Sequence, residues 1–180
     1  MNSKKSLIVL ITGASGTGKT SLTKALKEQD PHHLSVHYFD DIGIPDTQEM
    51  INTYGSIEKW QEETTKIWIR KLSELNEEII ILEGSFNPSF AISELKTLGT
   101  QDYLLICCHT EQKVREKRLL ELRQQPELIT QDMENYAQFL RLKTLELKGI
   151  ILNTTDKSLS QLVKKIKTLI EDKLNRVSTI

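Results

Sequence analysis

The segment ITGASGTGKTSLTKAL, residues 11–26, places glycines at positions 13, 16 and 18 shortly before a lysine and a threonine. The apolar run LIVLI, residues 7–11, leads into it and is typical of a strand buried on both faces. Apolar residues at 22, 25 and 26 follow with the spacing of one helical face. Backbone N–H groups at a helix start lack partners and, with the helix dipole, bind anions. Strand, glycine-rich turn and helix together therefore predict a phosphate-binding loop.

The spacing G-x-x-x-x-G-K-T begins at Gly13 and ends at Thr20. In such a loop the lysine reaches the β- and γ-phosphates, and the threonine hydroxyl is a ligand of Mg²⁺. ATP and Mg²⁺ are therefore the predicted cofactors, with Lys19 in a catalytic role and Thr20 as a metal ligand. This spacing is the Walker A motif, so the chain resembles the P-loop nucleoside-triphosphate-binding proteins. The residues expected to contact the nucleotide are Gly13, Ser15, Gly16, Thr17, Gly18, Lys19, Thr20 and Ser21.

Size and charge restrict the class of protein. The 180 residues suffice for one α/β domain with a sizeable core, and we predict a single domain over residues 1–180. The net charge of −1 provides no global field that would attract nucleic acid or an anionic membrane. Cys107 and Cys108 are neighbours in an apolar run, so they face opposite sides of a strand and are not expected to pair. We expect a cytoplasmic protein, a monomer or homodimer, without a membrane or nucleic-acid partner.

Strand and helix signals alternate along the chain. Short apolar runs separated by helices imply a parallel sheet covered on both faces, which is an α/β fold. Capping residues indicate helix starts at Asp46, Ser56 and Asn87, and Gly99 and Gly149 are the expected helix ends. The predicted strands are residues 7–11, 36–39, 79–82, 103–108 and about 150–152.

Acidic residues follow two of these strands, at the edge of the sheet where ligands bind. Asp40 and Asp41 come after the second strand, and a carboxylate there suits Mg²⁺ coordination or deprotonation of an attacking hydroxyl. The alternative is a solvated turn. Glu83 ends the third strand and is predicted either to assist the metal or simply to cap the loop. Gly84 behind it would let substrate or loop backbone approach closely.

Spaced arginines mark the segment before Pro126. An arginine that closes over the γ-phosphate stabilises the charge that spreads there during transfer. A basic helix is equally often a solvated face, but its position before a proline loop favours a lid over residues 118–132, which would exclude water. Arg141, on the next predicted helix, is a further candidate for a phosphate contact.

With these motifs the chain resembles the small P-loop kinases of the nucleotide-kinase-like group, which includes shikimate kinase, gluconate kinase and chloramphenicol phosphotransferase. The resemblance covers nearly the whole chain and rests on the segments GASGTGKT, HYFDD, REKRLLELRQQP and ILNTTDKSLSQL. It implies a three-layer P-loop NTPase fold, with a five-stranded parallel sheet in the order 2-3-1-4-5, helices on both faces and a short lid.

The resemblance also implies roles for individual residues. Asp40 corresponds to an acid that acts as base or as a metal-linked substrate ligand. Arg118 corresponds to an arginine that packs on the adenine or the phosphates, and Arg123 to one that reaches the γ-phosphate. Asn153 and Thr154 stand where the turn after the fifth strand lines the adenine. The expected catalytic set is therefore Lys19, Asp40, Arg118 and Arg123, and the expected metal ligands are Thr20, Asp40 and Glu83.

The acceptor side departs from the patterns of that group. Shikimate kinases carry Gly-Gly after strand three, whereas this chain has Glu83-Gly84-Ser85, which argues against shikimate. The segment after strand two also has no arginine that matches the monophosphate clamp of adenylate kinases. We predict an acceptor-binding segment over residues 40–76. Its aromatic residues indicate a partly apolar or ring-bearing acceptor, or else plain core. The predicted substrate contacts are Asp41, Tyr54, Trp60, Gly84 and Phe86.

The sequence therefore predicts a Mg²⁺-dependent kinase that moves the γ-phosphoryl group of ATP to a hydroxyl of a small molecule. The main alternative is a P-loop ATPase or a nucleotide-binding regulatory module without an acceptor. A switch GTPase is disfavoured because Leu82-Glu83-Gly84 and Cys108-His109 stand where its motifs belong. A polynucleotide 5′-hydroxyl kinase is less favoured still, because it would require a basic groove.

Overall fold

A computed structural model describes residues 6–100 and 102–177 of the chain. Five parallel strands form one sheet in the order β2-β3-β1-β4-β5, as predicted. In its centre Ile11 pairs with Glu83 on one side and with Ile106 on the other. The strands are β1 (Leu7–Thr12), β2 (Leu34–Tyr38), β3 (Ile79–Glu83), β4 (Tyr103–His109) and β5 (Ile150–Asn153).

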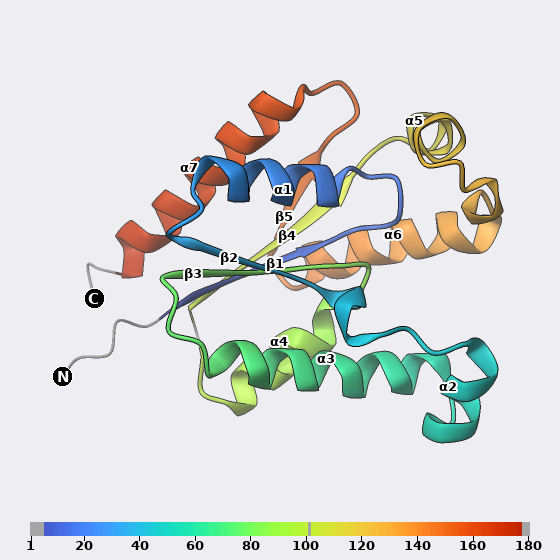
Figure 1. The fold of residues 1–180 in the computed structure, drawn as a ribbon, viewed down its shortest axis with the longest axis horizontal. Helices are drawn as coiled ribbons and strands as arrows, with labels where there is room; N and C mark the ends of the chain where they lie inside the picture. The colour runs from blue at the N-terminus through green and yellow to red at the C-terminus, as the bar shows by residue number, and fades with distance from the viewer. Residues whose placement is uncertain (1–5, 101, 178–180) are drawn as a thin grey trace.

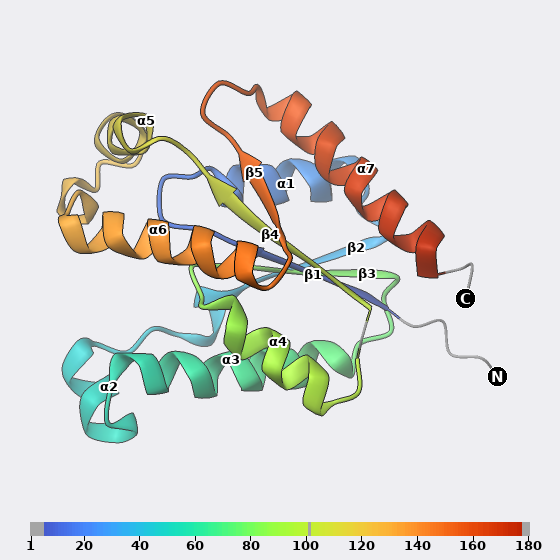
Figure 2. The ribbon, with the colours of Figure 1, turned by 180° about the vertical axis from the view of Figure 1, so that it is seen from behind.

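Helices cover both faces of the sheet and make the three predicted layers (Figures 1 and 2). One face carries α1 (Lys19–Gln29) and α7 (Leu159–Val177), and the other carries α3 (Ile57–Ser73), α4 (Pro88–Thr97) and α6 (Gln131–Glu146). The shorter elements gather at one end of the sheet, on the right in Figure 1. These are η1 (Phe39–Ile42), α2 (Thr47–Tyr54), α5 (Gln112–Lys117), η2 (Arg118–Leu122) and η3 (Pro126–Leu128).

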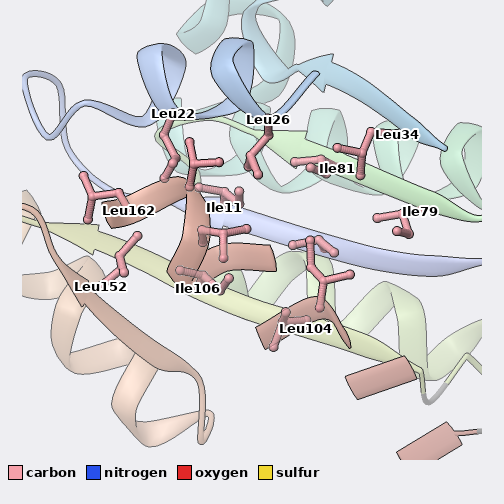
Figure 3. Close-up of a cluster of buried hydrophobic side chains, with 14 of the residues drawn as sticks. Ile11, Leu22, Leu26, Leu34, Ile79, Ile81, Leu104, Ile106, Leu152 and Leu162 are labelled. Atoms are coloured by element: carbon pink, nitrogen blue, oxygen red, sulfur yellow. The ribbon is translucent and has the colours of Figure 1, made fainter. Parts of the chain in front are cut away.

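The core lies in two layers because the central strand is buried on both sides. Every residue of β1 is buried, and its side chains alternate between the two layers. Figure 3 shows the first layer, in which Leu22 and Leu26 of α1 and Leu162 of α7 face the sheet. The second layer, under α3 and α4, contains Trp68, Ile69, Phe86 and Leu105. The glycine-rich loop therefore leaves the sheet from its central, fully buried strand.

Helix starts follow the sequence closely, whereas one helix end differs. The side chains of Asp46, Ser56 and Asn87 each accept a hydrogen bond from a first-turn N–H group, as predicted. The prediction that a helix runs to Gly149 was wrong, because α6 ends at Glu146. The left-handed residue there is Lys148, with φ of 58°. A Cβ atom on Gly149 would lie 2.7 Å from Thr144 and 2.8 Å from Leu105, so tight packing explains this glycine.

Two further features bear on the prediction. Cys107 and Cys108 are buried and unpaired, as the strand geometry required. Across residues 6–100 and 102–177, none of the helices is both long and apolar enough to cross a membrane.

Candidate functional site

The glycine-rich loop curls at the start of α1. Gly13, Gly16 and Gly18 have φ values of 143°, 84° and 87°, which side chains rarely tolerate. A Cβ atom on Gly13 would lie 2.4 Å from the carbonyl oxygen of Cys108, so the loop rests directly on β4. Gly18 is the N-cap of α1, and no side chain caps this helix. The first N–H groups of an eleven-residue helix are thus left without a side-chain acceptor, in the geometry that binds a phosphate.

Lys19 is held inside the loop. Its side chain is 6% exposed, and Nζ donates to the carbonyl oxygen of Ala14 at 3.1 Å and to Oγ of Ser85 at 3.4 Å. Nζ also lies 4.0 Å from Oε1 of Glu83. Burial lowers the pKa of Lys19, and the nearby Glu83 carboxylate opposes this change. The ammonium group is therefore fixed between the loop and the end of β3.

Carboxylates and cations meet in a cavity of about 230 Å³, here called the inner cavity. Asp40 enters it from η1 and Glu83 from β3, opposite Lys19 and Arg123. Burial raises the pKa of both carboxyl groups, and Lys19 opposes the rise in each. The Asp41 carboxylate adds to the rise in the pKa of Asp40. Ionisation of these carboxyl groups is therefore less favourable than in water, and a cation bound between them would offset that cost.

The oxygen atoms of the inner cavity fit Mg²⁺. The Thr20 hydroxyl donates to Oε2 of Glu83 at 3.1 Å, and Asp40 lines the same cavity. Hydroxyl and carboxylate oxygens are ligands that Mg²⁺ prefers. Among the residues that the structure describes, no three His, Cys, Asp or Glu side chains form a metal-binding group. An ion at Thr20 would therefore share its coordination with phosphate and water oxygens, as Mg²⁺ commonly does.

A second cavity of about 470 Å³, the outer cavity, lies along the other side of the loop and is lined by residues 16–21. Arg118 donates through Nη1 to the Thr154 hydroxyl at 3.1 Å and through Nη2 to the Thr154 carbonyl at 2.8 Å. The Thr154 hydroxyl in turn donates to the carbonyl of Thr17 at 2.8 Å. These bonds join the segment after β4, the segment after β5 and the phosphate loop. Arg123 lines both cavities and so connects them.

Sequence reasoning missed several residues of the outer cavity. Leu122, which is 77% exposed, lines it together with Lys157 and Leu159. No periodic pattern distinguishes a leucine that faces a cavity from one that faces solvent, so no signal marked them. Arg115 was also missed: it is 1% exposed and pairs through Nη2 with Oε2 of Glu134 at 2.6 Å.

Some predicted residues lie elsewhere. Arg141 and Asn153 are not among the residues that line the two cavities, and the Asn153 side chain accepts a hydrogen bond from the N–H of Thr155. Asp41 and Tyr54 are exposed and lie outside the inner cavity.

Two of the three predicted aromatic contacts, Trp60 and Phe86, are core residues. Trp60 is 7% exposed and Phe86 is fully buried, and both rings pack on Phe39. Of the two alternatives that the sequence left open for them, the structure favours plain core. Gly84 does line the inner cavity, but a Cβ atom there would lie 2.4 Å from Cβ of Phe39. Packing therefore already requires glycine at this position.

A third cavity of about 310 Å³, here called the apolar cavity, lies between α3, α4 and α6. Ser85 connects it to the inner cavity. The Ser85 hydroxyl donates to the carbonyl of Gly13 at 2.8 Å. The Ser85 carbonyl accepts from Oη of Tyr136 at 3.0 Å and from Nε2 of Gln61 at 3.4 Å. The apolar cavity is lined by Ile57, Glu58, Gln61, Asn87, Phe90, Tyr136 and Phe139.

Comparison with known proteins identifies the fold. No family model and no curated protein matches the sequence, but solved structures match nearly all of it. Shikimate kinase from Acinetobacter baumannii, in complex with shikimate, has 16% identity and a TM-score of 0.64, covering 94% of this chain and 95% of its own. A gluconokinase from Sinorhizobium meliloti has 13% identity and a TM-score of 0.64, covering 99% of each chain. APS kinase from Mycobacterium tuberculosis, in complex with AMPPNP and APS, has 14% identity and a TM-score of 0.59, covering 93% of this chain and 98% of its own. The chain therefore has the P-loop nucleotide-kinase-like fold.

Proposed function

We propose that this protein is a Mg²⁺-dependent kinase that transfers the γ-phosphoryl group of ATP to a hydroxyl group of a small molecule. The observation that carries the proposal is the shared lining of the two cavities by Lys19 and Arg123. A nucleotide in the outer cavity would direct its terminal phosphate toward the inner cavity, where Asp40 and Glu83 lie. Carboxylates have no use as phosphate ligands, so they indicate metal binding and activation of an acceptor.

Each part of the site has a role in this proposal. The loop amides and Lys19 bind the phosphates, and the adenine ring of ATP packs against Arg118 and Leu122 in the outer cavity. Thr20, with Glu83 or Asp40, would hold Mg²⁺, which would neutralise part of the phosphate charge. Asp40 orients the acceptor hydroxyl or takes its proton on a carboxylate oxygen. Arg123 stabilises the charge on the phosphoryl group during transfer.

The proposal extends to the organisation of the chain. Residues 118–132 act as the lid, residues 40–76 contribute to acceptor binding, and the chain functions as one domain. Unpaired, buried Cys107 and Cys108 suit a reducing compartment such as the cytoplasm. Solved neighbours support the small-molecule class of acceptor, since one contains shikimate and another contains APS with AMPPNP.

The test is transfer of label from γ-labelled ATP with Mg²⁺ into a fractionated extract of small metabolites. Wild type is compared with Lys19→Ala and Asp40→Asn, and Asp102→Asn, at the opposite end of the sheet, is the matched control. We expect a labelled small product with wild type and the control and none with the other two. ATP binding that requires Lys19, with free phosphate as the sole labelled product, would overturn the kinase and favour an ATPase or regulatory module.

A further inference from the structure

We infer that the apolar cavity holds the acceptor, and that it selects a molecule with an apolar, ring-sized part and without a carboxylate or phosphate group. This inference rests on the proposed function and adds the chemical class of the substrate. The volume of the apolar cavity, about 310 Å³, is at the lower end of the range for small-molecule sites. Three of its lining residues, Ile57, Phe90 and Phe139, offer apolar side chains.

The position of the apolar cavity suits an acceptor. It is separated from the inner cavity by Ser85, whose hydroxyl lies 3.4 Å from Nζ of Lys19. The carbonyl oxygen of Ser85 accepts hydrogen bonds from Tyr136 and Gln61, two residues that line the apolar cavity. An acceptor whose body lies in the apolar cavity would thus reach past a single residue to present a hydroxyl to the inner cavity.

The charge of the lining excludes an acidic acceptor. None of the lining residues is a lysine, arginine or histidine, and the one charged residue is Glu58. A carboxylate or phosphate removed from water at this site would have no cation to pair with, which is strongly unfavourable. Lys19 and Arg123 line the neighbouring inner cavity, and the proposed function assigns both of them to the phosphates of ATP.

The polar groups of Gln61 and Tyr136 are already used within the protein. Oε1 of Gln61 accepts from the N–H of Asn87 at 2.9 Å, and Nε2 donates to Oη of Tyr136 at 3.2 Å as well as to Ser85. The Tyr136 hydroxyl is committed to the Ser85 carbonyl. A ligand that needed several donors would have to break these bonds, whereas an apolar ring would leave them intact.

Two helix starts border the apolar cavity, and helix starts normally attract anions. Each of them is capped by a side chain here. At α4, Asn87 accepts the N–H of Ser89, and Pro88 has no N–H to offer. At α3, the Ser56 side chain accepts a hydrogen bond from the N–H of Lys59. The Glu58 carboxylate in the first turn also interacts favourably with the positive end of the helix dipole. Neither helix therefore offsets the lack of a basic side chain.

A matched set of probes tests the selectivity directly. 1,4-Benzenedimethanol is neutral, 4-(hydroxymethyl)benzylamine is cationic and 4-(hydroxymethyl)benzoate is anionic, while ring and hydroxyl stay the same. Binding is measured by ligand-observed NMR titration in the presence of AMPPNP and Mg²⁺. We expect the neutral and cationic probes to bind at least about tenfold more tightly than the anionic probe, because only the last loses its solvation without a partner. Equal or tighter binding of the benzoate, or no binding of any probe, would overturn the inference.

A charge-changing variant locates the effect in the apolar cavity. Phe139 is 37% exposed, so Phe139→Lys should fold normally while it adds an ammonium group to the lining. It should strengthen binding of the benzoate and weaken binding of the amine. Leu142→Lys is the control, because Leu142 lies on the same helix, is 59% exposed and does not line the cavity. The same change in both variants would show that the probes respond to overall charge and would sink the assignment.

The natural acceptor gives an independent test that separates this inference from the proposed function. The charge of the labelled product from the metabolite extract is determined by electrophoresis at neutral pH, and the charge of the one transferred phosphoryl group is subtracted to obtain that of the acceptor. A neutral or cationic acceptor supports the inference. An acidic acceptor overturns it and leaves the kinase intact, whereas the absence of any product, with selective binding of the probes, overturns the kinase and leaves the cavity assigned.

Discussion

At the residue scale, Gly84 illustrates a position fixed by packing at the edge of a site. The absence of a side chain at Gly84 leaves room for Phe39. The ring of Phe39 stacks on that of Phe86 with the centroids 5.5 Å apart, and it meets the ring of Trp60 edge-on with the centroids 6.1 Å apart. Phe39 is therefore not free to move, and Gly84→Ala should destabilise the fold by about 1–3 kcal/mol. Urea unfolding measures this cost. Ser93→Ala, on the exposed side of α4, should stay within about 0.5 kcal/mol, and equal values for the two variants would contradict the clash.

A second residue-scale prediction concerns the acid limb of the pH profile. A carboxylate that binds metal or takes a proton must be ionised, so the rate falls as pH falls through its pKa in the folded protein. Partial burial raises the pKa of Asp40 above its ordinary value of 3.8, so kcat/KM should decline at a higher pH than for a fully solvated aspartate. The Asp41 carboxylate contributes to this rise, and Asp41→Asn should therefore move the limb to lower pH.

The same experiment identifies the carboxyl group in control. Burial raises the pKa of Glu83 too, but the charges that act on it are those of Lys19, Asp40 and Arg123. If Asp41→Asn leaves the acid limb of the pH profile unchanged, the titrating group is Glu83, which would contradict the role given to Asp40.

At the element scale, a buried ion pair joins the two helices that flank the proposed lid, residues 118–132. Arg115 of α5 and Glu134 of α6 lie at 2.6 Å, with 1% and 12% of their side chains exposed. Arg115→Met should cost about 3–5 kcal/mol, because it leaves the glutamate uncompensated. The double variant Arg115→Met with Glu134→Gln should recover much of that loss, since the remaining group carries no charge. Urea unfolding of the full mutant cycle measures both effects, and strictly additive losses would show that the pair is not coupled.

Elements and their starts could be predicted because their signals are local. A five-residue apolar run, a glycine-rich turn and three capping side chains each act within a few positions of the chain. The end of α6 escaped prediction because Gly149 was taken for its terminator, whereas Lys148 adopts the left-handed conformation. Gly149 is instead required by contacts with Leu105, which is distant in sequence.

The proposed acceptor site could be predicted only in part: the predicted segment 40–76 contains Ile57, Glu58 and Gln61, but the other lining residues come from the start of α4 and from α6. Gln61 and Tyr136 are 75 positions apart, and both meet Ser85. Their residue types carry no motif, and only the packing of α6 beside α3 and α4 brings them together. Trp60 and Phe86 were more conspicuous in the sequence, yet their size suits them to the core.

At the scale of the whole molecule, the outer cavity is lined by residues that are far apart in the sequence. The phosphate loop follows β1, Thr154 follows β5 and Arg118 lies between them in sequence. A ligand that binds only this assembled site should stabilise the entire fold. With AMPPNP and Mg²⁺ at about 100 times Kd, the free energy of unfolding should rise by about 2.7 kcal/mol. Urea titration with and without the nucleotide measures the rise. Lys19→Ala should lose most of it at the same nucleotide concentration, and an unchanged response would contradict the role of Lys19.

Removing the metal should weaken this stabilisation. Without Mg²⁺ the phosphates would face Glu83 and Asp40 across the inner cavity, and like charges at short range in a partly buried site repel strongly. AMPPNP with EDTA should therefore stabilise the wild type less than AMPPNP with Mg²⁺. In Glu83→Gln one of the two charges is absent, so the difference between the two conditions should shrink, mainly because binding in EDTA improves. Were EDTA to have the same effect on both proteins, Glu83 would have no part in coupling the metal to the nucleotide, and its bond to Thr20 would serve only to order the loop.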